Sequence, residues 1–191
     1  QEKAEAARPY SSRLEEMLAS LASSASSGEG IIKLLTGTGN DQNYIVVPVS
    51  ADRGLCGGFN SSINRETFKL VKSLEGDGKN VQIIPVGKKS RDFFNRVMKD
   101  QITESFVDLN ISNTGYESAL QVSNKLQELY FEGKFDKCIL IFNKFKSAIS
   151  QEVTQQQLIP LDVSDSSKED SVDDSTVKAI YDYEPDEETI L

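Results

Sequence analysis

Apolar residues along this chain alternate between short β-branched runs and longer stretches with the spacing of an amphipathic helix. The short runs predict strands at residues 44–49, 81–86, 105–109 and 137–142. The longer stretches predict helices at residues 59–74 and 87–99, and a third that opens at Thr114 with Glu117 as a capping box. The run at 137–142 is apolar throughout, which is typical of a central strand covered on both faces. This strand–helix–strand alternation predicts an α/β fold with a mostly parallel sheet and right-handed crossovers.

The last third of the chain departs from this alternation. Residues 152–160 and 176–183 have strand-like patterns, and the acidic, serine-rich linker between them, residues 162–175, has no helical period. We therefore predict that these two segments form a loosely joined antiparallel pair. Pro185 ends the second strand, and residues 186–191 are expected to begin a further helix.

The N-terminal residues 1–27 are predicted to form one long helix. Its apolar residues follow alternating steps of three and four along a narrow seam: Ala7, Tyr10, Leu14, Met17 and Leu21. Such a seam is typical of one arm of a two-helix coiled coil, and packing against the chain's own domain is the simpler alternative. The serine- and glycine-rich stretch 23–30 is expected to end this helix.

Both ends of the chain look like interrupted helices, and Gln1 is not an initiator Met. We therefore expect a fragment with three parts. These are a stub of an N-terminal coiled-coil helix (1–27), an α/β domain (28–185) and the start of a C-terminal coiled-coil helix (186–191).

Composition narrows the classes of function. The chain is 38% apolar and 27% charged, as in ordinary soluble domains, and no apolar run reaches the roughly 18 residues that cross a bilayer. Histidine is absent, which excludes cysteine–histidine and serine–histidine catalysis within the chain. Residues 162–191 carry eleven acids and two lysines and hence all of the net charge of −9, so nothing resembles a basic nucleic-acid face. Cys56 and Cys138 are expected to be reduced thiols.

A loop with three glycines follows the first predicted strand. The stretch VVPVSADRGLCGGFN, residues 46–60, predicts a strand, a tight turn and a helix start, and we call residues 52–59 the glycine loop. Its glycines, Gly54, Gly57 and Gly58, indicate positive φ or a close approach of the backbone. Such a loop can cradle a phosphate, hold a reactive cysteine or present a rigid surface to a protein partner.

The chemical alternatives have weak support. The glycine loop matches neither the mononucleotide pattern, which needs a lysine, nor the spacing of the dinucleotide fingerprint. Cys56 could be a nucleophile near a helix N-terminus and Arg53, with Asp52 taking the proton, although a small residue packed in a turn is the simpler interpretation. The sequence Gly87-Lys88-Lys89 could bind an anion at a sheet edge, although solvated lysines are the simpler interpretation.

Four segments resemble the gamma subunit of F-type ATP synthases. The run SADRGLCGGFNSSINRE at residues 50–66 is similar to the signature loop of that family. Three further runs agree: AEAARPYSSRLEEMLASL at 4–21, PVGKKSRDFF at 85–94 and YDYEPDEETIL at 181–191. The resemblance covers the whole chain and is closest to bacterial, proteobacterial forms.

This resemblance implies a non-catalytic rotor subunit without a cofactor. The terminal helices would form an antiparallel coiled coil inside a ring of alpha and beta subunits. A Rossmann-like α/β domain at the foot of this shaft would contact the epsilon subunit and the membrane ring of c subunits. The implied location is the cytoplasmic face of the bacterial inner membrane, with the mitochondrial matrix as the alternative.

The same resemblance places a partner contact in the glycine loop. Arg53 would lie near acidic loops of the beta subunits, because an arginine fork suits carboxylates, while Asp52 would orient the loop. The expected partner-contact residues are Asp52, Arg53, Gly54, Leu55, Cys56, Gly57 and Gly58. For Arg53 the alternative is a local salt bridge with Asp52. For the whole chain the alternative is an independent Rossmann-like nucleotide- or small-molecule-binding protein that uses the glycine loop.

Overall fold

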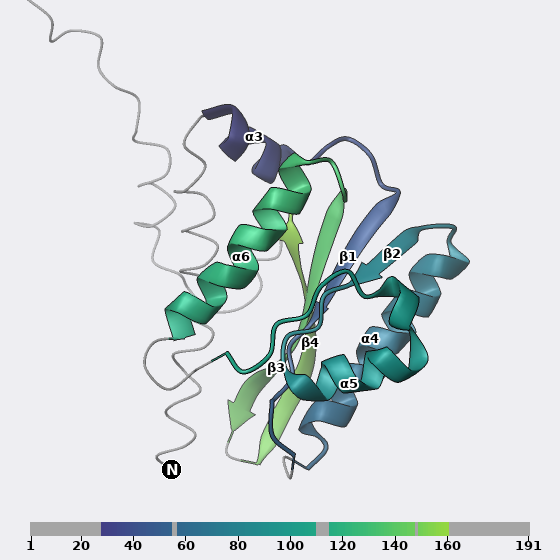
Figure 1. Cartoon of the computed structure of the whole chain (residues 1–191), viewed down its shortest axis with the longest axis vertical. Coiled ribbons are helices and arrows are strands. Elements are labelled where there is room, and N and C mark those ends of the chain that lie inside the picture. Colours follow the sequence, from purple (N-terminus) through teal and green to yellow (C-terminus); the bar gives the residue numbers. More distant parts are fainter. Residues whose placement is uncertain (1–27, 55–56, 110–114, 148, 161–191) are drawn as a thin grey trace, which may run out of the picture. The chain divides into compact units, whose positions relative to one another are not determined.

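A four-stranded sheet with the order β2-β1-β3-β4 lies at the centre of the computed structural model, which describes residues 28–54, 57–109, 115–147 and 149–160 (Figure 1). Strands β2 (Asn80–Ile83), β1 (Asn43–Pro48) and β3 (Lys137–Ser147) are parallel. Strand β4 (Ser150–Ile159) runs antiparallel to β3. The prediction of a mostly parallel sheet with a C-terminal antiparallel pair is therefore confirmed.

Helices cover both faces of this sheet (Figure 1). Helices α4 (Phe59–Gly76) and α5 (Lys88–Val97) lie on one face, with the short 3-10 helix η1 (Lys99–Gln101) after α5. Helices α6 (Gly115–Phe131) and α3 (Gly28–Thr36) lie on the other face. Each predicted crossover helix is present within a few residues of its expected bounds.

The two faces of the central strands contribute to two separate cores, because successive side chains of a strand point in opposite directions. The core under α4 and α5 contains Tyr44, Val46, Ile63, Val71, Ile83, Phe94 and Ile141. The core under α6 and α3 contains Leu34, Ile45, Val47, Leu126, Phe135, Cys138 and Leu140. The apolar run of β3 contributes to both cores, and β3 lies between β1 and β4, as predicted for a central strand.

Two predicted strands are shorter than expected. Strand β2 ends at Ile83 instead of residue 86, and residues 105–109 form no named strand. Beyond Ile83 the pairing continues only as isolated bridges: Val49 with Val86, Ile83 with Ile102, and Val86 with Phe106. Two prolines explain the interruption, because proline has no backbone N–H to donate to a ladder. The Ile84 and Val86 amides donate toward β1, so the donor missing on that side is Pro48, and Pro85 lacks a donor on the side of Ile102 and Phe106.

Strand β4 has a neighbour that the sequence did not predict. It pairs with β3 as a hairpin, whereas the predicted partner of residues 152–160 was the segment 176–183. The reason is that β3 continues to Ser147, five residues beyond its predicted end at 142, and brings the chain directly to the start of β4. Residues 176–183 lie outside the described part of the chain.

The prediction that 23–30 ends a helix is wrong for its last residues, because α3 begins at Gly28. Tertiary packing overrides the weak helix propensity of glycine here. Leu34 is buried in the core, and the Tyr130 hydroxyl on α6 donates a 2.7 Å hydrogen bond to the carbonyl of Lys33. Gly37, with φ 80°, then ends the helix in the left-handed conformation.

The predictions for residues 1–27, 162–185 and 186–191 lie outside the described residues. Among the helices that the structure describes, none combines the length and apolar character needed to cross a bilayer.

Candidate partner-contact site

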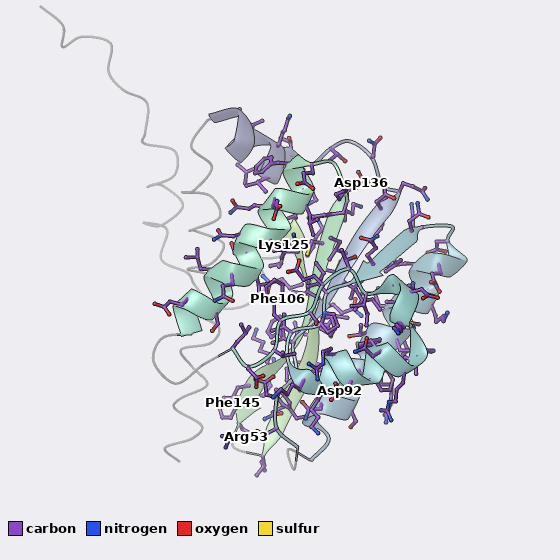
Figure 2. All side chains as sticks on the ribbon, viewed as in Figure 1. Arg53, Asp92, Phe106, Lys125, Asp136 and Phe145 are labelled. Atoms are coloured by element: carbon purple, nitrogen blue, oxygen red, sulfur yellow. The ribbon has the colours of Figure 1, made fainter. Side chains whose placement is uncertain are left out.

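The glycine loop lies at the carboxyl end of β1, between that strand and α4. In Figure 2, Arg53 lies at one end of the sheet together with Phe145, and Asp136 lies at the opposite end. Arg53 and Gly54 are exposed, as are Gly57 and Gly58, whereas Asp52 is half-buried. Leu55 and Cys56 lie outside the described residues.

The segment that leads into the loop is bound to the first turn of α5. The backbone N–H groups of residues 88–90 donate hydrogen bonds to three consecutive residues of that segment. The acceptors are Asp52 Oδ1 at 2.9 Å, the Ala51 carbonyl at 3.2 Å and Ser50 Oγ at 2.9 Å. We call these three hydrogen bonds the α5 clamp.

Buried polar side chains extend the α5 clamp to α4. Ser90, which is fully buried, donates from its hydroxyl to Asn64 Oδ1 on α4 at 2.7 Å. Asn60, in the first turn of α4, accepts the Ala51 N–H at 2.9 Å and donates to the Arg53 carbonyl at 3.4 Å. The backbone on both sides of Asp52 is therefore held by one side chain of α4, that of Asn60.

Glycine is required at one position of this site, and that position is outside the loop. Gly87 has φ 98°, and a Cβ there would lie 2.2 Å from the Ser50 carbonyl oxygen. Of the three loop glycines, all of which the structure describes, only Gly57 has a positive φ, 56°. The expectation that all three loop glycines need positive φ or a close approach is wrong for two of them. A Cβ on Gly54 would make ordinary contact with the Lys89 side chain at 3.6 Å, and one on Gly58 would meet nothing within 4 Å.

The α5 clamp also bears on whether Gly87-Lys88-Lys89 binds an anion, as the sequence allowed. The first amides of a helix are the groups that hold anions, because they point at the ligand and lack partners within the helix. Here Asp52, Ala51 and Ser50 already accept from them, and the Lys88 ammonium pairs with Asp108 at 2.6 Å. This favours a structural role for that helix start.

The cysteine that the structure describes does not have the character of a nucleophile. Cys138 is fully buried in the core under α6, and burial raises the pKa of its thiol far above the ordinary range. A group of three or more potential metal-ligating side chains is absent from the described ranges.

Sequence reasoning did not single out Ser50, Asn60, Asn64 or Ser90, and it considered Gly87 only as part of an anion site. Two signals were available. A glycine directly between a strand and a helix indicates a close backbone approach, and small hydroxyl residues on the inner face of a helix indicate a buried polar contact.

Fold and site together define a class: a Rossmann-like α/β domain whose own loop covers a helix start at the carboxyl end of the sheet, where such folds hold ligands. Comparison with known proteins gives the family. The model of the family ATP-synt, described as ATP synthase, matches residues 1–191, and the chain belongs to this family.

Relatives named ATP synthase gamma chain support this family. That of Rhodospirillum rubrum is 45% identical over 193 residues, covering 100% of this chain and 64% of the relative. That of Paramagnetospirillum magneticum is 43% identical, covering 98% of this chain and 63% of the relative. The chain thus spans somewhat less than two thirds of the length of these relatives.

A solved structure supports the fold. A chain in the central stalk and c-ring of the Tetrahymena thermophila mitochondrial ATP synthase matches with a TM-score of 0.53 and 28% identity. The match covers 78% of this chain and 68% of that one.

Proposed function

We propose that this chain is the foot of the central rotor of a proton-translocating F-type ATP synthase, corresponding to the gamma subunit. The observation that carries the proposal is the family match over residues 1–191, together with relatives named ATP synthase gamma chain. In this role it transmits rotation between the membrane c ring and the ring of alpha and beta subunits, with the epsilon subunit as a further partner. The chain itself makes and breaks no bonds, and it works at the membrane surface.

Within this function, we infer that Arg53 is the partner-contact side chain of the glycine loop. Its side chain is exposed, while its backbone carbonyl is held by Asn60. A guanidinium matches carboxylates with a planar fork, so an acidic loop of a beta subunit is a suitable partner. An exposed cation on a fixed backbone suits a contact that must be remade at each step of rotation. Gly54, Leu55, Cys56, Gly57 and Gly58 would complete this surface.

A chimera tests the function. Residues 1–191 would replace the matching segment of the Rhodospirillum rubrum gamma chain, and ATP synthesis and ATP-driven proton pumping would be measured in membranes. We expect both activities to persist. Loss of both activities from a chimera that assembles would contradict the rotor proposal.

Arg53→Ala in this chimera tests the contact. Because the partner carboxylate would be left unpaired, we expect the ratio of ATP synthesis to ATP hydrolysis to fall by roughly three- to tenfold. Arg96→Ala is the matched control, since Arg96 is exposed at the far end of α5. Equal ratios in the two variants would reject Arg53 as the contact residue.

The nucleotide-binding alternative makes the opposite prediction for the isolated chain. We expect no heat of binding when ATP is titrated into it. Stoichiometric binding would support the alternative.

A further inference from the structure

Asp52 occupies the position at the start of α5 where an external anion would otherwise bind. The first amides of a helix have no partner within the helix, and the residue before α5, Gly87, has no side chain to supply one. Asp52 supplies it from a different element, through the 2.9 Å hydrogen bond from the Lys88 N–H to its Oδ1. A carboxylate is well suited to this place, because the N-terminus of a helix carries a partial positive charge.

The segment before Asp52 lies close against the residues that precede α5. Gly87 lies against the Ser50 carbonyl, and Ser50 also donates its N–H to the Val86 carbonyl at 2.8 Å. Val49 is the one residue between β1 and the α5 clamp, and its N–H donates to the Ile141 carbonyl at 2.8 Å. The next residue after Asp52 is Arg53, so the clamp fixes the backbone from which the arginine projects.

We propose that Asp52 is a positioning residue: its carboxylate acts as an internal anion at the start of α5 and fixes the backbone of the glycine loop. On this view Asp52 does not contact a partner subunit, although it was expected among the contact residues. The positioning role concerns this chain alone. Its consequence for coupling depends on the function proposed for Arg53.

Hydrogen exchange of the 191-residue chain tests the positioning role. In Asp52→Ala we expect exchange of the Lys88 amide, and of amides in the described part of the loop, to rise by about tenfold, because a charge-assisted hydrogen bond is lost. Asp92→Ala is the matched control, since Asp92 is an exposed carboxylate on the same helix, 2.7 Å from Arg91. Exchange in this control should equal that of the wild type.

Chemical rescue separates an anion role from a general loss of packing. Formate is small enough to replace the carboxylate removed by Asp52→Ala, and we expect it to lower the exchange of the Lys88 amide in this variant but not in the wild type. The proposal would be overturned if the Lys88 amide exchanged at the wild-type rate in Asp52→Ala, or if it exchanged faster but formate did not slow it.

If Asp52→Ala does not fold, Asp52→Asn replaces it. Asparagine keeps an oxygen acceptor without the charge, so its exchange should lie between those of the wild type and the fully unfolded chain, and exchange equal to the wild type would overturn the proposal.

A double-mutant cycle in the chimera separates this proposal from the proposed function. If Asp52 acts through Arg53, Asp52→Ala should lower the ratio of synthesis to hydrolysis alone but add nothing to Arg53→Ala. Additive losses would overturn the link between the two residues. Raised exchange with unchanged coupling would leave the positioning role intact and reject the contact role of the loop.

Discussion

The two ends of the parallel sheet use the same device for different purposes. At the amino end, Asp136 precedes β3 and its carboxylate accepts from the Gln42 and Asn43 amides at 3.0 and 2.8 Å and from the Thr38 hydroxyl at 2.9 Å. At the carboxyl end, Asp52 accepts from the Lys88 amide. In both cases one aspartate replaces a missing backbone partner and fixes a loop. The distinction lies in what each loop then carries.

At the amino end, charged side chains form ion pairs with one another. Asp136 is buried, and Asp41 beside it forms ion pairs with Lys79 at 3.2 Å and Lys137 at 3.1 Å. The Tyr44 hydroxyl donates to the same Asp41 carboxylate. The carboxyl end instead holds the backbone and leaves the Arg53 side chain exposed. The ion pairs at the amino end stabilise the domain, whereas an exposed guanidinium on a fixed backbone can also reach a partner.

The largest effect is expected at the carboxyl end, from Gly87→Ala. The new Cβ would lie 2.2 Å from the Ser50 carbonyl oxygen at a φ of 98°, so strain and displacement of the α5 clamp add together. We expect the free energy of unfolding to fall by about 3–5 kcal/mol, measured by urea denaturation followed by circular dichroism.

Gly76→Ala is the matched control for this substitution. Gly76 is the last residue of α4, and a Cβ there would meet nothing within 4 Å. Its effect should stay within about 1 kcal/mol in either direction. If the two variants unfolded at the same urea concentration, the close approach at Gly87 would have no energetic importance.

The second largest effect is expected at the amino end, from Asp136→Ala. Two backbone amides and one hydroxyl lose their acceptor at a buried position, which should lower the free energy of unfolding by about 2–3 kcal/mol. Asp100→Ala, on the exposed surface of η1, should change it by less than about 0.5 kcal/mol. We also expect Asp136→Ala to leave coupling in the chimera unchanged, because we assign the charges at this end to domain stability and not to a partner contact. Impaired coupling in a chimera that is stable and assembled would break the comparison.

Sequence periodicity predicted the features that depend on burial alone. The apolar runs of β1 and β3 and the spacing in α4 and α5 follow from two faces that must both be covered, so their positions were right to within a few residues. The features that failed depend on a second segment. Helix α3 exists because Leu34 reaches the core under α6, and β4 pairs with β3 because β3 continues through a partly polar stretch to Ser147.

In the candidate site, too, local features could be predicted and contacts with a second segment could not. The glycine loop and its exposed arginine could be located from the sequence, because glycines next to charged residues after a strand indicate a turn. The α5 clamp could not, since it joins residues 50–52 to residues 88–90 through hydrogen bonds that no local pattern specifies. The expectation that Asp52 orients the loop agrees with the role we propose for it, whereas its expected place among the partner contacts does not.

The smallest effect is a pH dependence at the amino end. The hydrogen bond from Tyr44, followed by those from Lys137 and Lys79, lowers the pKa of Asp41 to about 2. Burial and the hydrogen bond to Asp41 in turn raise the pKa of Tyr44 to about 12. Because the carboxyl pKa is lower in the folded state than in the unfolded state, its contribution is complete well above pH 4 and is lost as the pH falls through about 2.

Asp41→Asn should therefore lower the urea midpoint at pH 6, and its difference from the wild type should shrink as the pH falls to 2 and below. Asp136 titrates in both proteins, but the Asp41 charge tends to raise its pKa, so Asp41→Asn lowers the pKa of Asp136 as well and the difference includes this coupling. Burial tends to raise the pKa of Asp136, but the amides of Asn43 and Gln42 and the Thr38 hydroxyl outweigh burial and lower it. A difference between Asp41→Asn and the wild type that stayed constant from pH 6 to pH 2 would show that the Asp41 charge does not stabilise the fold. The amino end would then be held by the neutral hydrogen bonds of its loop, and its contrast with the exposed charge of Arg53 would lose its electrostatic basis.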